Sequence, residues 1–133
     1  MSPVFVDTSA LYALLVESDA NHAPARSAFE SLQRREAALV SSSYLLVEFY
    51  ALLGRRVGLD AVAEFRKDFA PLLDIVWVDA ELHDEGLELL LDRHRESLSL
   101  VDAVSFLVAR RHAVDEVFAY DPDFQREGFT AVS

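Results

Sequence analysis

The chain has 133 residues, a net charge of −11 and no cysteine. This length fits one folding unit with a substantial core, so we expect a single domain over residues 1–133. The negative charge argues against broad electrostatic attachment to nucleic acid or to anionic membranes. The start of the chain lacks the pattern of a signal peptide, and no apolar run reaches the ~20 residues of a membrane span. We therefore expect a cytoplasmic protein without disulfides.

Short apolar runs alternate with amphipathic segments along the chain. The predicted strands cover residues 4–6, 38–40, 75–78, 117–119 and, as a last short strand, 130–132. The predicted helices cover residues 9–16, 22–35, 42 or 43 to 55, 60–69, 80–94 and 99–112. Strands that alternate with helices indicate parallel strands joined by right-handed crossovers. The predicted fold is of the α/β class, a three-layer α/β/α sandwich with a central, mostly parallel sheet.

Carboxylates that follow strands are candidates for a functional site, because open α/β sheets bind ligands outside the carboxyl ends of their strands. Asp7 follows the first predicted strand directly, and Asp121 follows the apolar segment that ends at Tyr120. Each could equally be a helix cap or a turn residue. Asp79, which follows the third predicted strand, shows how common that simpler role is.

Two further carboxylates interrupt apolar helix faces. Glu48 lies inside the run YLLVEFYALL. Since burial without a partner would be costly, it must either lie at the edge of the apolar stripe or face a positive group. Asp102 lies in SLSLVDAVSFLVAR, where Ser99 as the N-cap would make it a favoured acid in the first helical turn.

The four carboxylates of Asp7, Glu48, Asp102 and Asp121 could meet at one edge of the sheet. Four anions in one pocket repel each other and raise their pKa values until protons or cations neutralise them. Oxygen-only ligands suit hard divalent cations such as Mg²⁺ or Mn²⁺. Metals held in this way activate water and stabilise the leaving oxygen in phosphodiester cleavage. The chemistry therefore indicates a nuclease.

Four segments, VFVDTSAL, SSSYLLVEFYAL, LSLVDAVSFLVAR and FAYDPDF, resemble the acidic motifs of PIN domains, specifically of the VapC-type toxins of bacterial toxin–antitoxin pairs. The resemblance covers essentially the whole chain. It implies a Mg²⁺- or Mn²⁺-dependent endoribonuclease. The catalytic and metal-binding residues would be Asp7, Glu48, Asp102 and Asp121, and Asp123 would be an auxiliary fifth acid.

The resemblance also implies auxiliary roles and partners. Thr8 or Ser9 would hold a metal-bound water or a phosphate, although both could simply cap the first helix. Ser99 matches the small hydroxyl residue three positions before the third acid. The partners would be an RNA substrate, a small VapB-like antitoxin whose C-terminal segment blocks the acidic pocket, and a second copy of the chain in a homodimer. A transfer RNA, a ribosomal loop and a messenger RNA all remain open as substrates.

Other functions fit the residues less well. A receiver domain needs a lysine after its last strand, whereas Lys67, the only lysine, lies in a predicted helix. A haloacid-dehalogenase-type phosphatase needs an aspartate at the position of Ser9. A catalytically inactive PIN-like binding module and a non-toxin PIN nuclease remain alternatives, although the four acids argue against the first. The arginines at positions 34, 35, 55 and 56 could contact nucleic acid or complement helix dipoles.

Overall fold

The computed structural model describes residues 2–132, in which five parallel strands form one sheet in the order β3-β2-β1-β4-β5. Met1 and Ser133, the two ends of the predicted domain, lie outside the described residues. The strands are β1 (Val4–Val6), β2 (Leu39–Ser42), β3 (Leu73–Val76), β4 (Glu116–Phe118) and β5 (Thr130–Ala131). This arrangement confirms the predicted α/β fold with a parallel central sheet.

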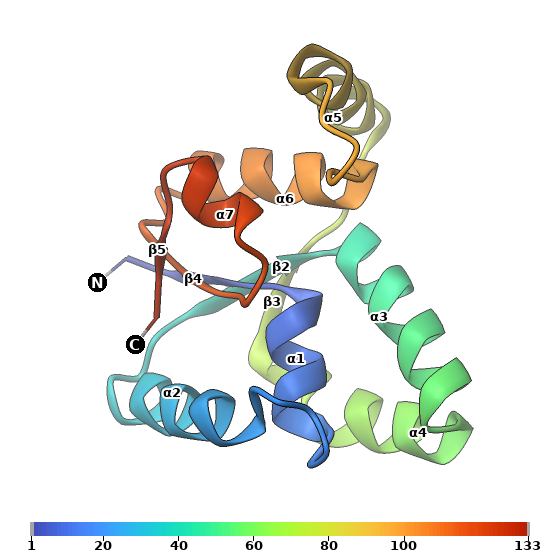
Figure 1. Ribbon diagram of the computed structural model, residues 1–133, viewed down its shortest axis with the longest axis vertical. Helices are drawn as coiled ribbons and strands as arrows, with labels where there is room; N and C mark the ends of the chain where they lie inside the picture. Colours follow the sequence, from blue (N-terminus) through green and yellow to red (C-terminus); the bar gives the residue numbers. More distant parts are fainter. Residues whose placement is uncertain (1, 133) are drawn as a thin grey trace.

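Helices cover both sides of this sheet, with α1 and α2 on one side and α5 and α6 on the other (Figure 1). The helices are α1 (Thr8–Leu15), α2 (His22–Arg34), α3 (Ser43–Arg56), α4 (Leu59–Asp68), α5 (Ala80–Arg93), α6 (Leu100–Arg111) and α7 (Asp123–Arg126), with a short 3-10 helix η1 (Ala70–Leu72). Within residues 2–132, no helix is both long and apolar enough to cross a membrane.

The central strand β1 is buried along its whole length. Phe5 pairs in register with Val40 of β2 and with Val117 of β4. A strand covered on both faces is apolar at every position, which is why VFV reads as a continuous run. The ladder continues one residue further, because the backbone N–H of Asp7 donates to the carbonyl of Phe118 at 3.0 Å. The sheet therefore fixes the backbone of Asp7 beside the end of β4.

Four of the five strands differ in their bounds from the prediction; β4 differs by one residue at each end, β5 by one residue at its end, and β2 and β3 differ more. β2 extends to Ser42, because two buried serines continue the strand: the Ser41 hydroxyl donates to the Val6 carbonyl at 3.1 Å, and Ser42 caps α3 by accepting from the Leu45 N–H at 3.1 Å. β3 begins at Leu73, two residues before the predicted start, where it pairs with Leu39. The end of β2 could not be predicted because its last two residues are polar. The start of β3 depends on pairing with β2, which the sequence pattern does not contain.

Helix α7 was not predicted at all. It has only four residues, Asp123–Arg126, and its buried Phe124 packs against Phe5 and Phe106 with ring centroids 5.9 and 5.1 Å apart. A single turn of this length depends on tertiary packing rather than on helix propensity.

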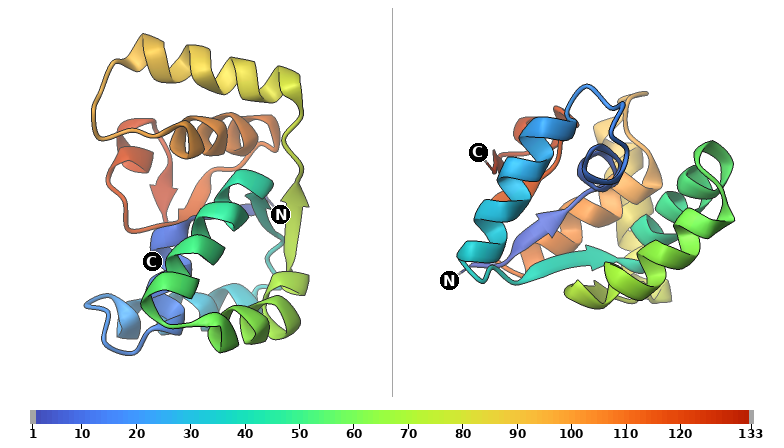
Figure 2. Two further views of the ribbon diagram at one scale, coloured as in Figure 1. Left: turned by 90° about the vertical axis from the view of Figure 1, so that its right-hand side faces the viewer. Right: turned by 90° about the horizontal axis from the view of Figure 1, so that it is seen from below.

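Helix α5 lies outside α6 (Figure 2) and packs on it through a glycine. The apolar residues at positions 82, 87, 90 and 91 predict one buried face of α5, but Leu87 and Leu91 are exposed. Gly86 instead faces α6, where a Cβ atom would lie 2.6 Å from Val104 Cγ2. The close approach of the two helices thus requires a residue without a side chain at position 86.

We expect the Gly86→Ala variant to lose about 1–3 kcal/mol of unfolding free energy, because overpacking at Val104 outweighs the gain in helix propensity. Gly54→Ala is the matched control, since a Cβ there would meet its nearest atoms at ordinary distances of 3.7 and 3.8 Å. That variant should gain up to about 1 kcal/mol. Urea unfolding monitored by circular dichroism measures both, and an equal response of the two glycines would contradict the close-packing argument.

Candidate active site

Asp7, at the end of β1, is the most buried of the four predicted acids, with 5% of its surface exposed. It is the N-cap of α1, and its carboxylate accepts from the N–H of Ser9 at 3.2 Å and from the hydroxyl of Ser9 at 2.7 Å. Burial raises its pKa from 3.8 to about 7, with smaller contributions from the charges of Asp102 and Asp121, against the opposing effect of the Ser9 bonds. Asp7 therefore is a helix cap, as one of the two interpretations predicted. The cap hydrogen bonds do not fully compensate the free-energy cost of burying its ionised carboxylate.

Glu48 projects from the exposed side of α3 and accepts a hydrogen bond from the Thr8 hydroxyl at 3.1 Å. Partial desolvation raises its pKa, and the charges of Asp102 and Asp121 raise it further. Among residues 2–132 it forms no ion pair. Glu48 could lie at the edge of the apolar stripe or face a positive group, and the structure shows the first. Its charged neighbours are acids, not an arginine or a lysine.

Asp102 is half-buried in the first turn of α6, where the predicted capping box is present. The Ser99 N–H donates to its carboxylate at 2.9 Å, and the Asp102 N–H donates to the Ser99 hydroxyl at 3.2 Å. Desolvation is the largest cause of its raised pKa, followed among the raising effects by the charges of Asp121 and Asp123. The capping box therefore sets the position of Asp102, while neighbouring acids destabilise its charge.

Asp121, after β4, completes the group because its charge raises the pKa of each of the other three acids. We call Asp7, Glu48, Asp102 and Asp121 the acidic pocket. None of the four forms an ion pair within the described part of the chain. Within that same part, no three or more acids or histidines lie close enough together, as their side chains stand, to hold a metal ion. The fold thus brings the four carboxylates together without supplying a cation from the protein.

The hydroxyls beside Asp7 hold these acids in place. The prediction that Thr8 or Ser9 caps α1 is wrong, because Asp7 itself is the cap and the helix starts at Thr8. The Ser9 hydroxyl accepts from the Tyr120 N–H at 2.9 Å while it donates to Asp7, so it links the ends of β1 and β4. Thr8 contacts Glu48.

Asp123 lies next to the acidic pocket but is buried among other partners. Its N–H donates to the carboxylate of Asp121 at 2.9 Å. Its own carboxylate accepts from Arg126 at 3.0 Å and from the Ser97 hydroxyl at 3.5 Å. Ser97 and Arg126 had not been singled out from the sequence, because they meet Asp123 only through the unpredicted α7 and the loop before α6. The auxiliary role of Asp123 stays a prediction.

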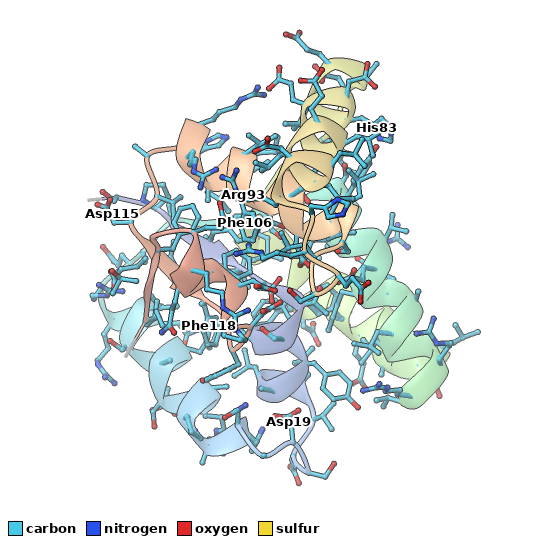
Figure 3. All side chains as sticks on the ribbon, turned by 45° about the horizontal axis from the view of Figure 1, so that its top comes forward. Asp19, His83, Arg93, Phe106, Asp115 and Phe118 are labelled. Carbon is cyan, nitrogen blue, oxygen red and sulfur yellow. The ribbon has the colours of Figure 1, made fainter. Side chains whose placement is uncertain are left out.

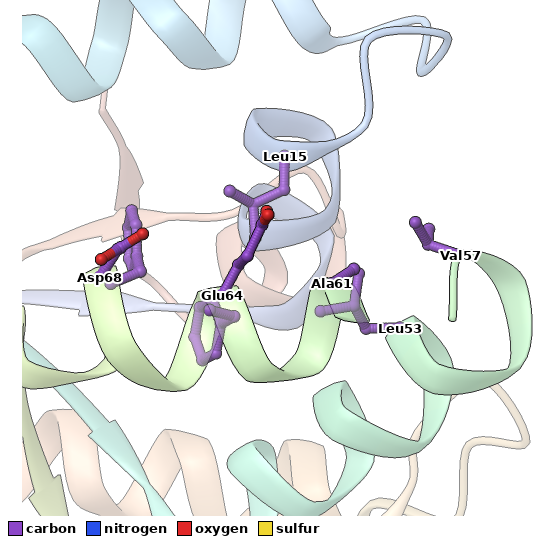
Figure 4. A pocket seen from close by; sticks show the side chains of 8 residues that line it. Leu15, Leu53, Val57, Ala61, Glu64 and Asp68 are labelled. Atoms are coloured by element: carbon purple, nitrogen blue, oxygen red, sulfur yellow. The ribbon is translucent and has the colours of Figure 1, made fainter. Parts of the chain in front are cut away.

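A separate groove of about 220 Å³ lies between α1, α3 and α4 (Figure 4). Apolar side chains such as Leu15, Val57 and Phe65 line it, together with Glu64 and Asp68. None of the four acids contributes to its wall. The groove and the acidic pocket are therefore distinct features of the surface.

The chain is similar over nearly its whole length to known proteins. The family model of the PIN domain matches residues 4–129. The chain is 33% identical, over 130 residues and 97% of both chains, to the 23S rRNA-specific endonuclease VapC20 of Mycobacterium tuberculosis. The crystal structure of VapC20, described as a sarcin-ricin loop cleaving toxin, superposes with a TM-score of 0.81 at 32% identity over 96% of each chain. FitAcB from Neisseria gonorrhoeae shares the fold, with a TM-score of 0.70 at 15% identity over 98% of this chain and 96% of its own.

We expect Asp7→Asn to stabilise the metal-free protein at pH 8 by up to about 4 kcal/mol, because an amide keeps the helix cap but removes a buried charge. The pKa of Asp7 is higher in the folded state (about 7) than the ordinary 3.8, so ionised Asp7 destabilises the fold as the pH rises through 7. The difference between variant and wild type should vanish as the pH falls toward 4. Thermal unfolding in a chelator over this pH range measures it, and a destabilised variant at pH 8 would contradict the burial argument.

Proposed function

This chain belongs to the PIN domain family and is a homologue of the VapC-type toxins, and from this premise we propose that it is a Mg²⁺- or Mn²⁺-dependent endoribonuclease. The observation that carries the proposal is the acidic pocket, in which the charge of Asp121 raises the pKa of the other three carboxylates and none of the four has an ion-pair partner in residues 2–132. Such a donor set, made of oxygen atoms alone, fits a hard divalent cation.

The acids of the pocket would hold the cation, and the residues around them would set their positions. When bound, the metal supplies an activated water and charge stabilisation at the phosphodiester. A bound cation would favour the ionised form of Asp7 at neutral pH, because the pKa of the metal-free carboxyl lies near neutrality. Ser9 orients Asp7, Thr8 orients Glu48, and Ser99 fixes Asp102 through the capping box. These hydroxyls are positioning residues in this proposal.

We propose a ribosomal RNA loop as the substrate, among the three classes left open by the sequence. VapC20, which matches 97% of this chain, carries the name of a 23S rRNA-specific endonuclease. Such a substrate requires a cytoplasmic location, and the whole chain would act as a single PIN domain. Recognition of an RNA loop depends on its shape and on backbone contacts, so the protein surface around the acidic pocket selects it.

We propose a small antitoxin as the second partner. The relative VapC20 is described as a toxin, and the resemblance of this chain to VapC-type toxins of toxin–antitoxin pairs implies such a partner. The acidic pocket in a chain of net charge −11 is complementary to a basic inhibitory segment, which would neutralise the four carboxylates in place of the metal.

We also propose a homodimer that forms through exposed apolar side chains beside the edge strand β3. Trp77 follows this strand and is 75% exposed. The next residue, Val78, donates its N–H to the Ser43 hydroxyl at the start of α3. Ser43 and the exposed Val47 are one helical turn apart, so the segment that carries Trp77 lies against the start of α3, which carries Val47. Exposed apolar groups that lie together in this way are typical of interfaces.

The purified protein, freed of antitoxin, should cleave 23S rRNA with Mg²⁺ or Mn²⁺ and lose activity in EDTA. Asp7→Asn and Asp121→Asn should lower the cleavage rate by at least ~100-fold, because each removes a ligand charge from the pocket. Asp79→Asn is the matched control, since Asp79 also follows a strand and caps a helix but lies outside the pocket. Primer extension across the cleaved RNA gives rates and sites. Full activity of Asp7→Asn, or equal loss in Asp79→Asn, would overturn the assignment, and the absence of cleavage by the wild type would favour a binding module.

The wild type should have the mass of a dimer in light scattering coupled to gel filtration, and Trp77→Glu should shift it to a monomer. Leu59→Glu is the control, because Leu59 is 79% exposed on α4, away from the proposed interface. A monomeric wild type, or the same shift in both variants, would contradict the proposed surface.

A further inference from the structure

Three arginines surround one buried glutamate beside α7. The side chain of Glu127 is 4% exposed, and its carboxylate accepts from Arg93 at 3.1 Å, from Arg95 at 3.1 Å and from Arg110 at 2.7 Å. The hydrogen bonds and charges of Arg93 and Arg110 lower the pKa of Glu127 to about 2, against the opposing effect of burial. Arg93 comes from the end of α5 (Figure 3), Arg95 from the following loop and Arg110 from α6. Three separate segments therefore converge on a single anion.

Asp123 extends this group by a second buried carboxylate. It pairs with Arg126 at 3.0 Å and lies 3.9 Å from the guanidinium of Arg95. We call Arg93, Arg95, Arg110 and Arg126 the arginine cluster. It contains four of the chain's 12 basic residues. The carboxylates paired with it carry three negative charges, those of the two buried acids and that of Asp92, which pairs with Arg93 at 3.1 Å. A local positive excess thus exists in a chain whose net charge is −11.

The guanidinium groups keep capacity for a further anion. All four arginine side chains are partly exposed, and Arg126 is the most accessible at 57%. Each guanidinium has five N–H donors, and the two buried carboxylates engage only some of them. Because these carboxylates already hold the side chains in place, an incoming phosphate would find them ordered, at a reduced entropic cost.

The cluster adjoins the acidic pocket through adjacent residues. Asp123, which binds Arg126, also donates its N–H to the carboxylate of Asp121. Of the arginines singled out from the sequence, Arg35 instead pairs with Glu116 at the start of β4, at the opposite end of this strand. Arg56 lies over the ring of Tyr12 at 5.4 Å.

We propose that the arginine cluster binds backbone phosphates of the RNA next to the bond that is cleaved. This inference rests on the proposed ribonuclease function and adds the surface that positions its substrate. An RNA approaching four carboxylates needs nearby positive charge, and guanidinium groups bind phosphate with directed hydrogen bonds. The arginines are positioning residues, because they contact the flanking backbone rather than the reacting phosphate.

Arg126→Gln tests the proposal with least risk to the fold, because Arg126 is exposed and pairs, within residues 2–132, with Asp123 alone. We expect KM for 23S rRNA to rise about three- to tenfold with kcat within twofold of the wild type, and the salt dependence of binding to fall by about one charge. Arg126→Lys should restore most of the loss. Arg26→Gln is the control, since Arg26 is an exposed arginine on α2.

Binding of a labelled hairpin with the sarcin–ricin loop sequence, measured in EDTA by fluorescence anisotropy, separates this inference from the catalytic one. A loss of affinity in Arg126→Gln would support RNA binding by the arginine cluster, whether or not the wild type cleaves RNA. A wild type that binds the hairpin but cleaves no RNA would overturn only the proposed ribonuclease function. Unchanged affinity, KM and salt dependence in Arg126→Gln would overturn the inference. So would an equal effect of Arg26→Gln, or a fall in kcat and melting temperature without a change in KM.

Discussion

Burial of a single carboxylate at the end of the central strand determines most of what surrounds it. Strands β2 and β4 pair with β1, and helices cover both faces of the sheet (Figure 1). Asp7 at the end of β1 is therefore hidden from water, and its pKa rises to about 7. Ser9 compensates part of this cost through two hydrogen bonds, and the same hydroxyl joins Asp7 to the end of β4. Ser9 does not neutralise the negative charge of Asp7, so a cation bound in the acidic pocket would stabilise it. The buried carboxylate of Asp7 thus explains both the local hydrogen bonds and the proposed metal binding.

The parts of the molecule that follow from local patterns could be predicted from the sequence. Continuous apolar residues predicted β1, and the spacing of Ser99 and Asp102 predicted a capping box, which the structure contains. The acids could be selected because strand ends and apolar helix faces are unusual places for charge. Their proximity in space follows from the parallel sheet, which brings the ends of its strands to one edge.

The remaining parts depend on contacts between distant segments. Ser41 and Ser42 belong to a strand because their hydroxyls find partners in the folded chain, which polarity cannot reveal. Helix α7 exists because Phe124 packs on the core. The partners of Glu127 lie 17 to 34 residues away in the chain, so no local motif marks them.

Two groups of opposite charge therefore lie side by side, and Asp121 and Asp123 connect them. The acidic pocket would bind the cation, and the arginine cluster would bind the RNA backbone. The most direct test of the central claim is a crystal structure grown with Mn²⁺ and recorded with anomalous scattering. We expect a Mn²⁺ peak coordinated by Asp7 together with at least two of Glu48, Asp102 and Asp121, and its loss in Asp7→Asn. Mn²⁺ bound only to other acids, such as those on α5, with none in the acidic pocket, would contradict the account.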